Sequence, residues 1–161
     1  LVSIGVPIKR HQAAIIDSVI MLAGTIYIVW VADNFFYPFQ GFLITLGVPV
    51  AVWSSIFVAD VVLRKKAYSE KDLFESNGIY GSVNKGSIFL MGVGSIIGWG
   101  FVTNTFAPWL EWQGYLLRFI GGKDGSWAYS NLGVIFALLI GFFGHIILSA
   151  RKIKAQESLL G

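Results

Sequence analysis

The chain has 161 residues, of which 55% are hydrophobic and only 13% are charged. A soluble chain of this length would expose large apolar patches, and the absence of cysteine excludes disulfides and thiolate metal sites. The net charge of +3 comes without the basic runs typical of nucleic-acid binding, so we expect no nucleic acid partner.

Four apolar segments dominate the chain, each close to the ~20 residues that a helix needs to cross the hydrocarbon core of a bilayer. The predicted spans are residues 13–31, 41–63, 86–106 and 131–150. Residues 64–85 would form a loop on one side of the membrane and residues 107–128 an interfacial segment on the other. We therefore expect an all-α membrane protein in which residues 1–161 form a single integral-membrane segment.

The basic residues predict the orientation of the spans. If the chain crosses four times, both termini and the loop of residues 64–85 share one side, which holds ten of the twelve Lys and Arg residues. The other side holds only Arg118 and Lys123. Because such an excess is typical of cytoplasmic loops, both ends are predicted to be cytoplasmic.

The second span contains Gly47 and Pro49. Proline has no N–H, and its ring clashes with the carbonyl four residues earlier, which here belongs to Thr45. Lipid offers no donor, so the freed carbonyl needs a partner in protein or in a water-filled cavity. The pattern suits either an ordinary kink or a discontinuous helix that lines a transport path. In both cases we expect helicity to be interrupted or sharply bent between Thr45 and Pro49.

Phe42, Pro49, Trp53 and Asp60 fall on one face of the second span. A stripe of this kind indicates helix packing more often than ligand binding. Asp60 lies four residues before Arg64, which is the spacing of an ion pair on a helix. We therefore expect Asp60 to be structural, close to the cytoplasmic interface, rather than to carry a coupling ion.

Two shorter patterns follow. Ser69 and Asp72 form a capping-box pattern that predicts a short helix in the cytoplasmic loop. In the third span, Gly94 and Gly98 form a pair of small residues that permits close helix approach.

Beyond the third span, apolar residues recur at intervals of three and four and predict an amphipathic interfacial helix. These residues are Trp109, Trp112, Leu116 and Phe119. The fourth span carries His145 without a second metal ligand at suitable spacing, so we expect a hydrogen-bonded histidine and neither a metal nor a cofactor. No enzyme motif is present, and no enzyme activity is predicted.

Several stretches, taken in order, resemble one known family. They are residues 39–49 with Trp53 and Asp60, then 63–66, 72–74, 98–100, 112–116 and 127–133. The series resembles the C-terminal part of bacterial purine–cytosine permeases, in the nucleobase–cation symporter-1 family, over nearly the whole chain. The resemblance implies a leucine-transporter-type fold of twelve helices, in which the four spans correspond to helices nine to twelve.

The resemblance also implies a role for the second span. In the family, the tenth helix bends over the substrate pocket as a thin outer gate. The gate residues implied here are Phe42, Leu43, Thr45, Gly47, Pro49 and Trp53. The family's main substrate and cation contacts come from helices one, three, six and eight, so none of them can be placed on this chain.

The implied function is symport of a nucleobase or related compound with Na⁺ or H⁺ across the bacterial cytoplasmic membrane. The implied partners are the lipid bilayer, the transported compound and the other helices of the same transporter. The first twelve residues read like a cytoplasmic linker, so we expect a piece of a larger protein. The alternative is a stand-alone four-helix membrane subunit with a structural or assembly role.

Overall fold

The computed structural model describes residues 10–30, 34–75, 78–81 and 83–159, so the expectation for the first residues of the chain lies largely outside these ranges. The described residues are all-α, with five α-helices, four of them long, and no strands. The α-helices are α1 (Arg10–Trp30), α2 (Phe36–Leu63), α3 (Glu70–Phe74), α4 (Lys85–Gly100) and α5 (Leu132–Ser158). Among the described residues, α2 and α5 are long and apolar enough to span a membrane.

The chain divides into two compact units, residues 1–40 and 41–161. In the first unit, α1 leaves most of its large apolar side chains exposed, and Met21 and Trp30 are 73% and 77% exposed. Leaving these apolar side chains in contact with water would have a large hydrophobic free-energy cost. In the same unit, the side chain of Asn34 accepts the backbone N–H of Phe36 at 2.7 Å and caps the start of α2.

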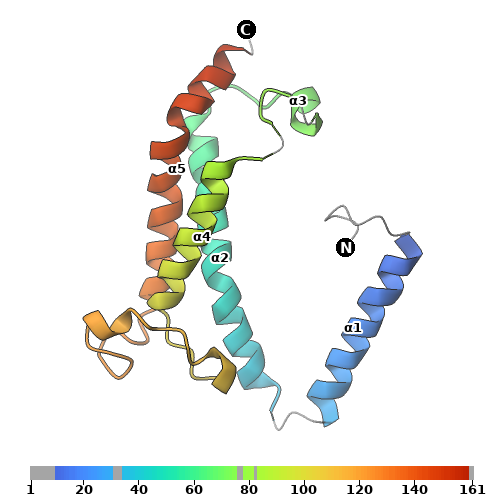
Figure 1. Cartoon of the computed structure of the whole chain (residues 1–161), viewed down its shortest axis with the longest axis vertical. Helices are drawn as coiled ribbons and strands as arrows, with labels where there is room; N and C mark the ends of the chain where they lie inside the picture. Colours follow the sequence, from blue (N-terminus) through green and yellow to red (C-terminus); the bar gives the residue numbers. More distant parts are fainter. Residues whose placement is uncertain (1–9, 31–33, 76–77, 82, 160–161) are drawn as a thin grey trace. The chain divides into compact units, whose positions relative to one another are not determined.

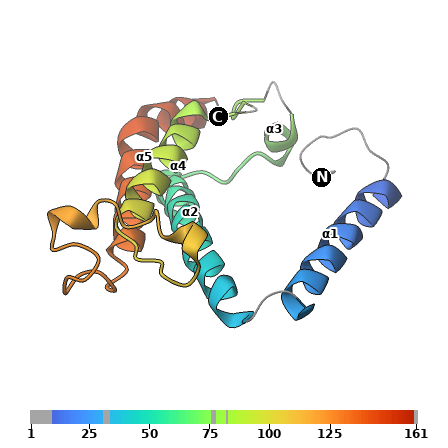
Figure 2. The same ribbon diagram turned by 60° about the horizontal axis from the view of Figure 1, so that its bottom comes forward.

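In the second unit, α2, α4 and α5 pack side by side, as both views of the ribbon show (Figures 1 and 2). Glycines permit the close approach that the sequence predicted. A Cβ at Gly94 would lie 2.8 Å from Val52 of α2, and one at Gly98 would overlap Val48. On α5, a Cβ at Gly141 would lie 2.8 Å from the carbonyl oxygen of Val52. The predicted packing role of the α4 glycines is confirmed.

The three long helices of this unit alternate in direction. The carboxyl ends of α2 and α5 meet the amino end of α4 at one end of the bundle, next to the loop that carries α3 (Figure 1). Residues 101–131 occupy the opposite end. The buried apolar core lies between the helices and consists of Val48, Ala51, Val52, Ile56, Leu90, Val102 and Ala137.

Helix α2 is not interrupted at its proline. We expected an interruption or a sharp bend between Thr45 and Pro49; of the two, the interruption is excluded, because α2 is continuous through these residues with Pro49 inside it. The discontinuous-helix interpretation is therefore wrong. The physical reason is that the carbonyl freed by the proline has another donor, which is described below.

The predicted third span is too long, because α4 ends at Gly100 rather than near Phe106. The carbonyls at the end of α4 accept bonds from residues that return to it. The N–H of Gly114 donates to Trp99 O at 2.8 Å, and the N–H of Leu116 donates to Gly100 O at 2.8 Å. These bonds satisfy groups that a longer helix would otherwise pair, so the helix ends there.

The predicted interfacial helix is also wrong. Between α4 and α5 lie only two short 3₁₀ turns, η2 (Pro108–Leu110) and η3 (Leu117–Phe119), joined by irregular backbone. Gly114 has φ +78° and Gly122 also has φ +78°, a region that a continuous right-handed helix does not visit. A spacing of three is shared by 3₁₀ turns and α-helices, which explains the error.

Candidate functional site

The residues that the resemblance assigns to a gate fall on differently exposed parts of α2. Phe42 and Leu43 are each 49% exposed, and Trp53 is 59% exposed. Gly47 is half-buried, and a Cβ added to it would meet no atom within 4 Å. This part of α2 therefore has an open, apolar side with free space beside Gly47.

Thr45 is the centre of a polar network near the amino end of α2, the end that the sequence predicts to face outward. Its hydroxyl donates to the carbonyl of Gly41 at 2.8 Å. The same oxygen accepts bonds from the amide of Gln113 at 2.6 Å and from the amide of Asn104 at 3.1 Å. The backbone carbonyl of Thr45 accepts the indole N–H of Trp99 at 2.8 Å. We call these five residues the outer polar cluster.

The bond from Trp99 explains why α2 tolerates Pro49. The proline leaves the Thr45 carbonyl without its usual helical donor, and the indole of α4 supplies one instead. The prediction that this carbonyl needs a partner is confirmed, and the partner is protein. The bond also joins α2 to α4 at the level where α2 lacks one backbone hydrogen bond.

The two amides of the outer polar cluster are deeply buried, with Asn104 2% exposed and Gln113 fully buried. The Nδ2 of Asn104 donates to Gly41 O at 2.8 Å and lies 3.5 Å from Oε1 of Gln113. Among the described residues, Oδ1 of Asn104 is buried without a hydrogen-bond partner. The cluster is therefore not fully satisfied, which is uncommon for buried polar atoms.

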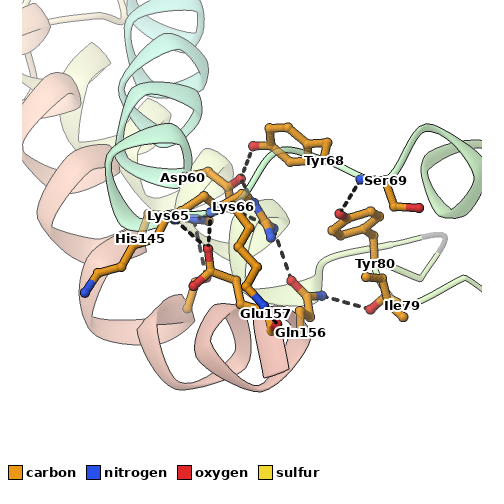
Figure 3. Close-up of polar contacts among 12 residues, drawn as sticks. Asp60, Lys65, Lys66, Tyr68, Ser69, Ile79, Tyr80, His145, Gln156 and Glu157 are labelled. Atoms are coloured by element: carbon orange, nitrogen blue, oxygen red, sulfur yellow. Dashed lines mark hydrogen bonds and ion pairs between the residues drawn. The ribbon is translucent and has the colours of Figure 1, made fainter. Parts of the chain in front are cut away.

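A second network lies near the carboxyl end of α2, the end that the sequence predicts to face inward, and centres on Asp60 (Figure 3). Oδ2 of Asp60 accepts bonds from Nε of Arg64 at 2.7 Å and from the hydroxyl of Tyr68 at 2.5 Å. Oδ1 lies 3.1 Å from Nε2 of His145, and Ser149 lies 3.4 Å from Nδ1 of the same ring. The predicted ion pair of Asp60 with Arg64 is confirmed, as is a hydrogen-bonded His145.

Arg64 connects this network to the segment that joins α2 to α4. Its guanidinium lies 4.7 Å from the ring centre of Tyr68 and 5.0 Å from that of Tyr80, and it donates to Oε1 of Gln156 at 3.1 Å. Gln156 in turn donates to the carbonyl of Ile79 at 3.0 Å. Arg64 thus ties the end of α2 to the end of α5 and to the loop between α3 and α4.

Tyr68 and Ser69 lie between α2 and α3 and hold the start of the segment that carries α3. Burial, together with the hydrogen bond to Asp60, raises the pKa of Tyr68, so its hydroxyl stays a donor at neutral pH. Ser69 caps α3 by accepting the N–H of Asp72 at 3.4 Å, as the sequence predicted. The backbone N–H of Ser69 is bonded to the hydroxyl of Tyr80 at 3.0 Å instead of to Asp72. We call Asp60, Arg64, Tyr68, His145 and Gln156 the inner polar cluster.

Two hollows adjoin the inner polar cluster. A groove of about 250 Å³ is lined by Trp53, Ile56, Phe57, Asp60, Asn84, Ser87, Met91 and His145. A smaller cavity of about 160 Å³ lies nearer the segment that carries α3, and Asp60 and Asn84 line both. Both oxygens of Asp60 are already engaged, which supports a structural role for this carboxylate.

Sequence reasoning missed the partners that lie far away along the chain. Trp99, Asn104 and Gln113 are 54, 59 and 68 positions from Thr45, and His145 is 85 positions from Asp60. A weak signal was present for three of them: Trp99, Asn104 and His145 are polar groups within predicted apolar spans, where a buried partner is needed.

Searches of protein-family models, curated proteins and solved structures found no match to this chain.

Proposed function

We propose that this chain is the C-terminal part of a bacterial secondary active transporter for nucleobases or related compounds, of the purine–cytosine permease type. The observation that carries the proposal is the ordered series of stretches from residue 39 to residue 133 that resembles this family. The helical bundle and the polar clusters of α2 are compatible with that role and add support to it.

The bundle is proposed to lie in the cytoplasmic membrane. In the most apolar windows of α2 and α5, only 33% and 28% of residues are buried. Core helices of soluble proteins would be mostly covered, so lipid or further helices are needed around them. Together with α1 and α4, these helices would give four spans, with helix α4 completed by irregular backbone whose Val102 and Asn104 are buried.

Both termini are proposed to be cytoplasmic. Within the second unit, the end of the bundle that carries α3 also carries Arg64, Lys65, Lys66, Lys71, Lys85, Arg151, Lys152 and Lys154. The opposite end carries Arg118 and Lys123. The positive-inside rule places the first end in the cytoplasm. Because the chain has no cysteine, single cysteines placed at Ser69 and Ser126 should react with an impermeant maleimide from opposite sides.

The open side of α2 is proposed to face the substrate pathway. Phe42, Leu43 and Trp53 would contact the transported compound or the remaining helices of the transporter, whereas Thr45, Gly47 and Pro49 would set the position of the gate. A transporter binds its substrate near the membrane midplane, between its two repeats. The principal binding residues would therefore lie on helices outside this chain.

A stand-alone four-helix membrane subunit is the second candidate. It is favoured by the second unit, residues 41–161, which has its own glycine-packed core and a polar network near each end. A subunit of this kind would assemble with other proteins without moving a solute.

Uptake separates the two candidates. Cells that carry the complete transporter should accumulate a radiolabelled nucleobase from a panel of uracil, cytosine, adenine and hypoxanthine, and uptake should depend on a Na⁺ or a proton gradient. The absence of uptake for the whole panel, with the protein present in the membrane, would contradict the proposal and favour the subunit.

A further inference from the structure

The outer half of α2 is held by side chains from elsewhere in addition to its own helical bonds. Pro49 removes the backbone bond to Thr45, and Gly47 has free space around its Cα. At this level the helical ladder is therefore at its weakest. Bonds from Trp99, Asn104 and Gln113 reach this stretch at Gly41 and Thr45 and fasten it to the rest of the bundle.

The bonds from Asn104 and Gln113 reach only two residues of α2, Gly41 and Thr45. Gln113 and Asn104 both donate to the hydroxyl of Thr45, and Asn104 also donates to the carbonyl of Gly41. The approach is tight, since a Cβ at Gly41 would lie 2.7 Å from Leu110 and 3.0 Å from Oδ1 of Asn104. A small displacement of α2 away from residues 104–113 would break all of these bonds together, because they share one short stretch of helix.

The closed arrangement is also incompletely paired. Asn104 is only 2% exposed, and its Oδ1 is buried without a hydrogen-bond partner among the described residues. Separation of α2 from the outer segment would let water reach this oxygen and the amide of Gln113, and the new water bonds would offset part of the loss. When the bonds lost on opening are partly replaced by bonds to water, the protein can exist in two states, one closed and one open.

We propose that Asn104 and Gln113 form a latch that positions the outer half of α2 and releases it as one unit with the opening of residues 101–114. The inference rests on the proposed function, because in a transporter this stretch of α2 is the outer gate. It goes beyond that function by assigning the positioning residues to the segment between α4 and α5, which carries no gate residue in the sequence-based interpretation.

Hydrogen exchange measured by mass spectrometry tests the latch in this chain, purified in detergent micelles. In Gln113→Met, which removes the donor to Thr45, amides of residues 41–47 and of residues 101–114 should both exchange roughly tenfold faster. The two segments should accelerate by the same factor, because they open together. Thr45→Val should give the same acceleration, and Thr45→Ser, which restores the hydroxyl, should return both segments to the unaltered rate.

Gln156→Met is the matched control. It makes the same chemical change at a buried glutamine, which is 7% exposed, at the other end of the bundle. It should accelerate exchange near Ile79 and leave residues 41–47 unchanged.

Acceleration of the outer segment alone, equal acceleration of residues 41–47 by both Gln→Met variants, or no recovery in Thr45→Ser would each overturn the proposal. None of these readouts involves transport, so a failed uptake experiment would refute the function and leave the latch standing.

Discussion

Trp99→Phe should destabilise the protein mainly by orphaning one carbonyl. The phenyl ring keeps most of the edge-to-face contact with Trp112, whose ring centre lies 5.7 Å away, but it loses the N–H that reaches Thr45 at 2.8 Å. Because Pro49 supplies no replacement donor, the Thr45 carbonyl is left without its bond. Leaving a buried acceptor unpaired costs about 1–3 kcal/mol of unfolding free energy.

Pro49→Ala changes that cost. Alanine restores the backbone N–H that bonds to the carbonyl of Thr45, so the carbonyl keeps a partner when the indole is removed. In the Pro49→Ala background, Trp99→Phe should therefore cost less than about 1 kcal/mol, mostly for the smaller ring. The double-mutant cycle should show a coupling energy of about 1–2 kcal/mol between the two positions.

The assay is equilibrium unfolding in mixed micelles, titrated with sodium dodecyl sulfate and followed by far-ultraviolet circular dichroism. Trp109→Phe, at a tryptophan that is 63% exposed, is the matched control and should change the unfolding free energy little. An equal cost of Trp99→Phe in both backgrounds would refute the reasoning, because the indole would then not be replacing the missing helical bond.

Three further predictions follow from the packing and the polar clusters. Gly98→Ala should lower the unfolding free energy by about 1–3 kcal/mol in the same titration, whereas Gly92→Ala, where a Cβ meets nothing within 4 Å, should not lower it; equal effects would contradict the close packing of α4. Asp60→Asn should reduce the yield of folded protein, measured by size-exclusion chromatography, more than it changes the cation dependence of uptake, because Arg64 loses its ion partner; normal yield with lost coupling would show that Asp60 carries the ion. The purified chain should bind no nucleobase in equilibrium dialysis, and saturable binding that Trp53→Ala abolishes would make it a binding module in its own right.

Local features of the fold could be predicted because their causes lie within a few residues. The Asp60–Arg64 pair, the Ser69 cap and the demand for a donor at Thr45 all depend on spacings of four residues or fewer. Glycine pairs predict close packing because a missing Cβ has the same consequence in any helical bundle.

Features that depend on distant residues could not be predicted from spacing. The carbonyl that Pro49 frees is paired by Trp99, and the carbonyls at the end of α4 are paired by Gly114 and Leu116. The sequence between the helices looked amphipathic because its aromatic residues recur every three or four positions. Its backbone instead follows the free carbonyl groups at the end of α4, which no periodicity records.

A reversible cross-link between α2 and the outer segment tests the central claim most directly. A Cβ at Gly41 would lie 3.3 Å from the Cβ of Phe106, close to the ~3.5–4.5 Å that a disulfide requires, and the chain has no cysteine of its own. In the proposed complete transporter carrying Gly41→Cys and Phe106→Cys, oxidation should stop the nucleobase uptake that the same protein shows in dithiothreitol, whereas oxidant should not change the uptake of either single variant. If mass spectrometry shows the protein to be cross-linked and it still takes up nucleobase as fast as it does in dithiothreitol, a moving outer gate in α2 is contradicted.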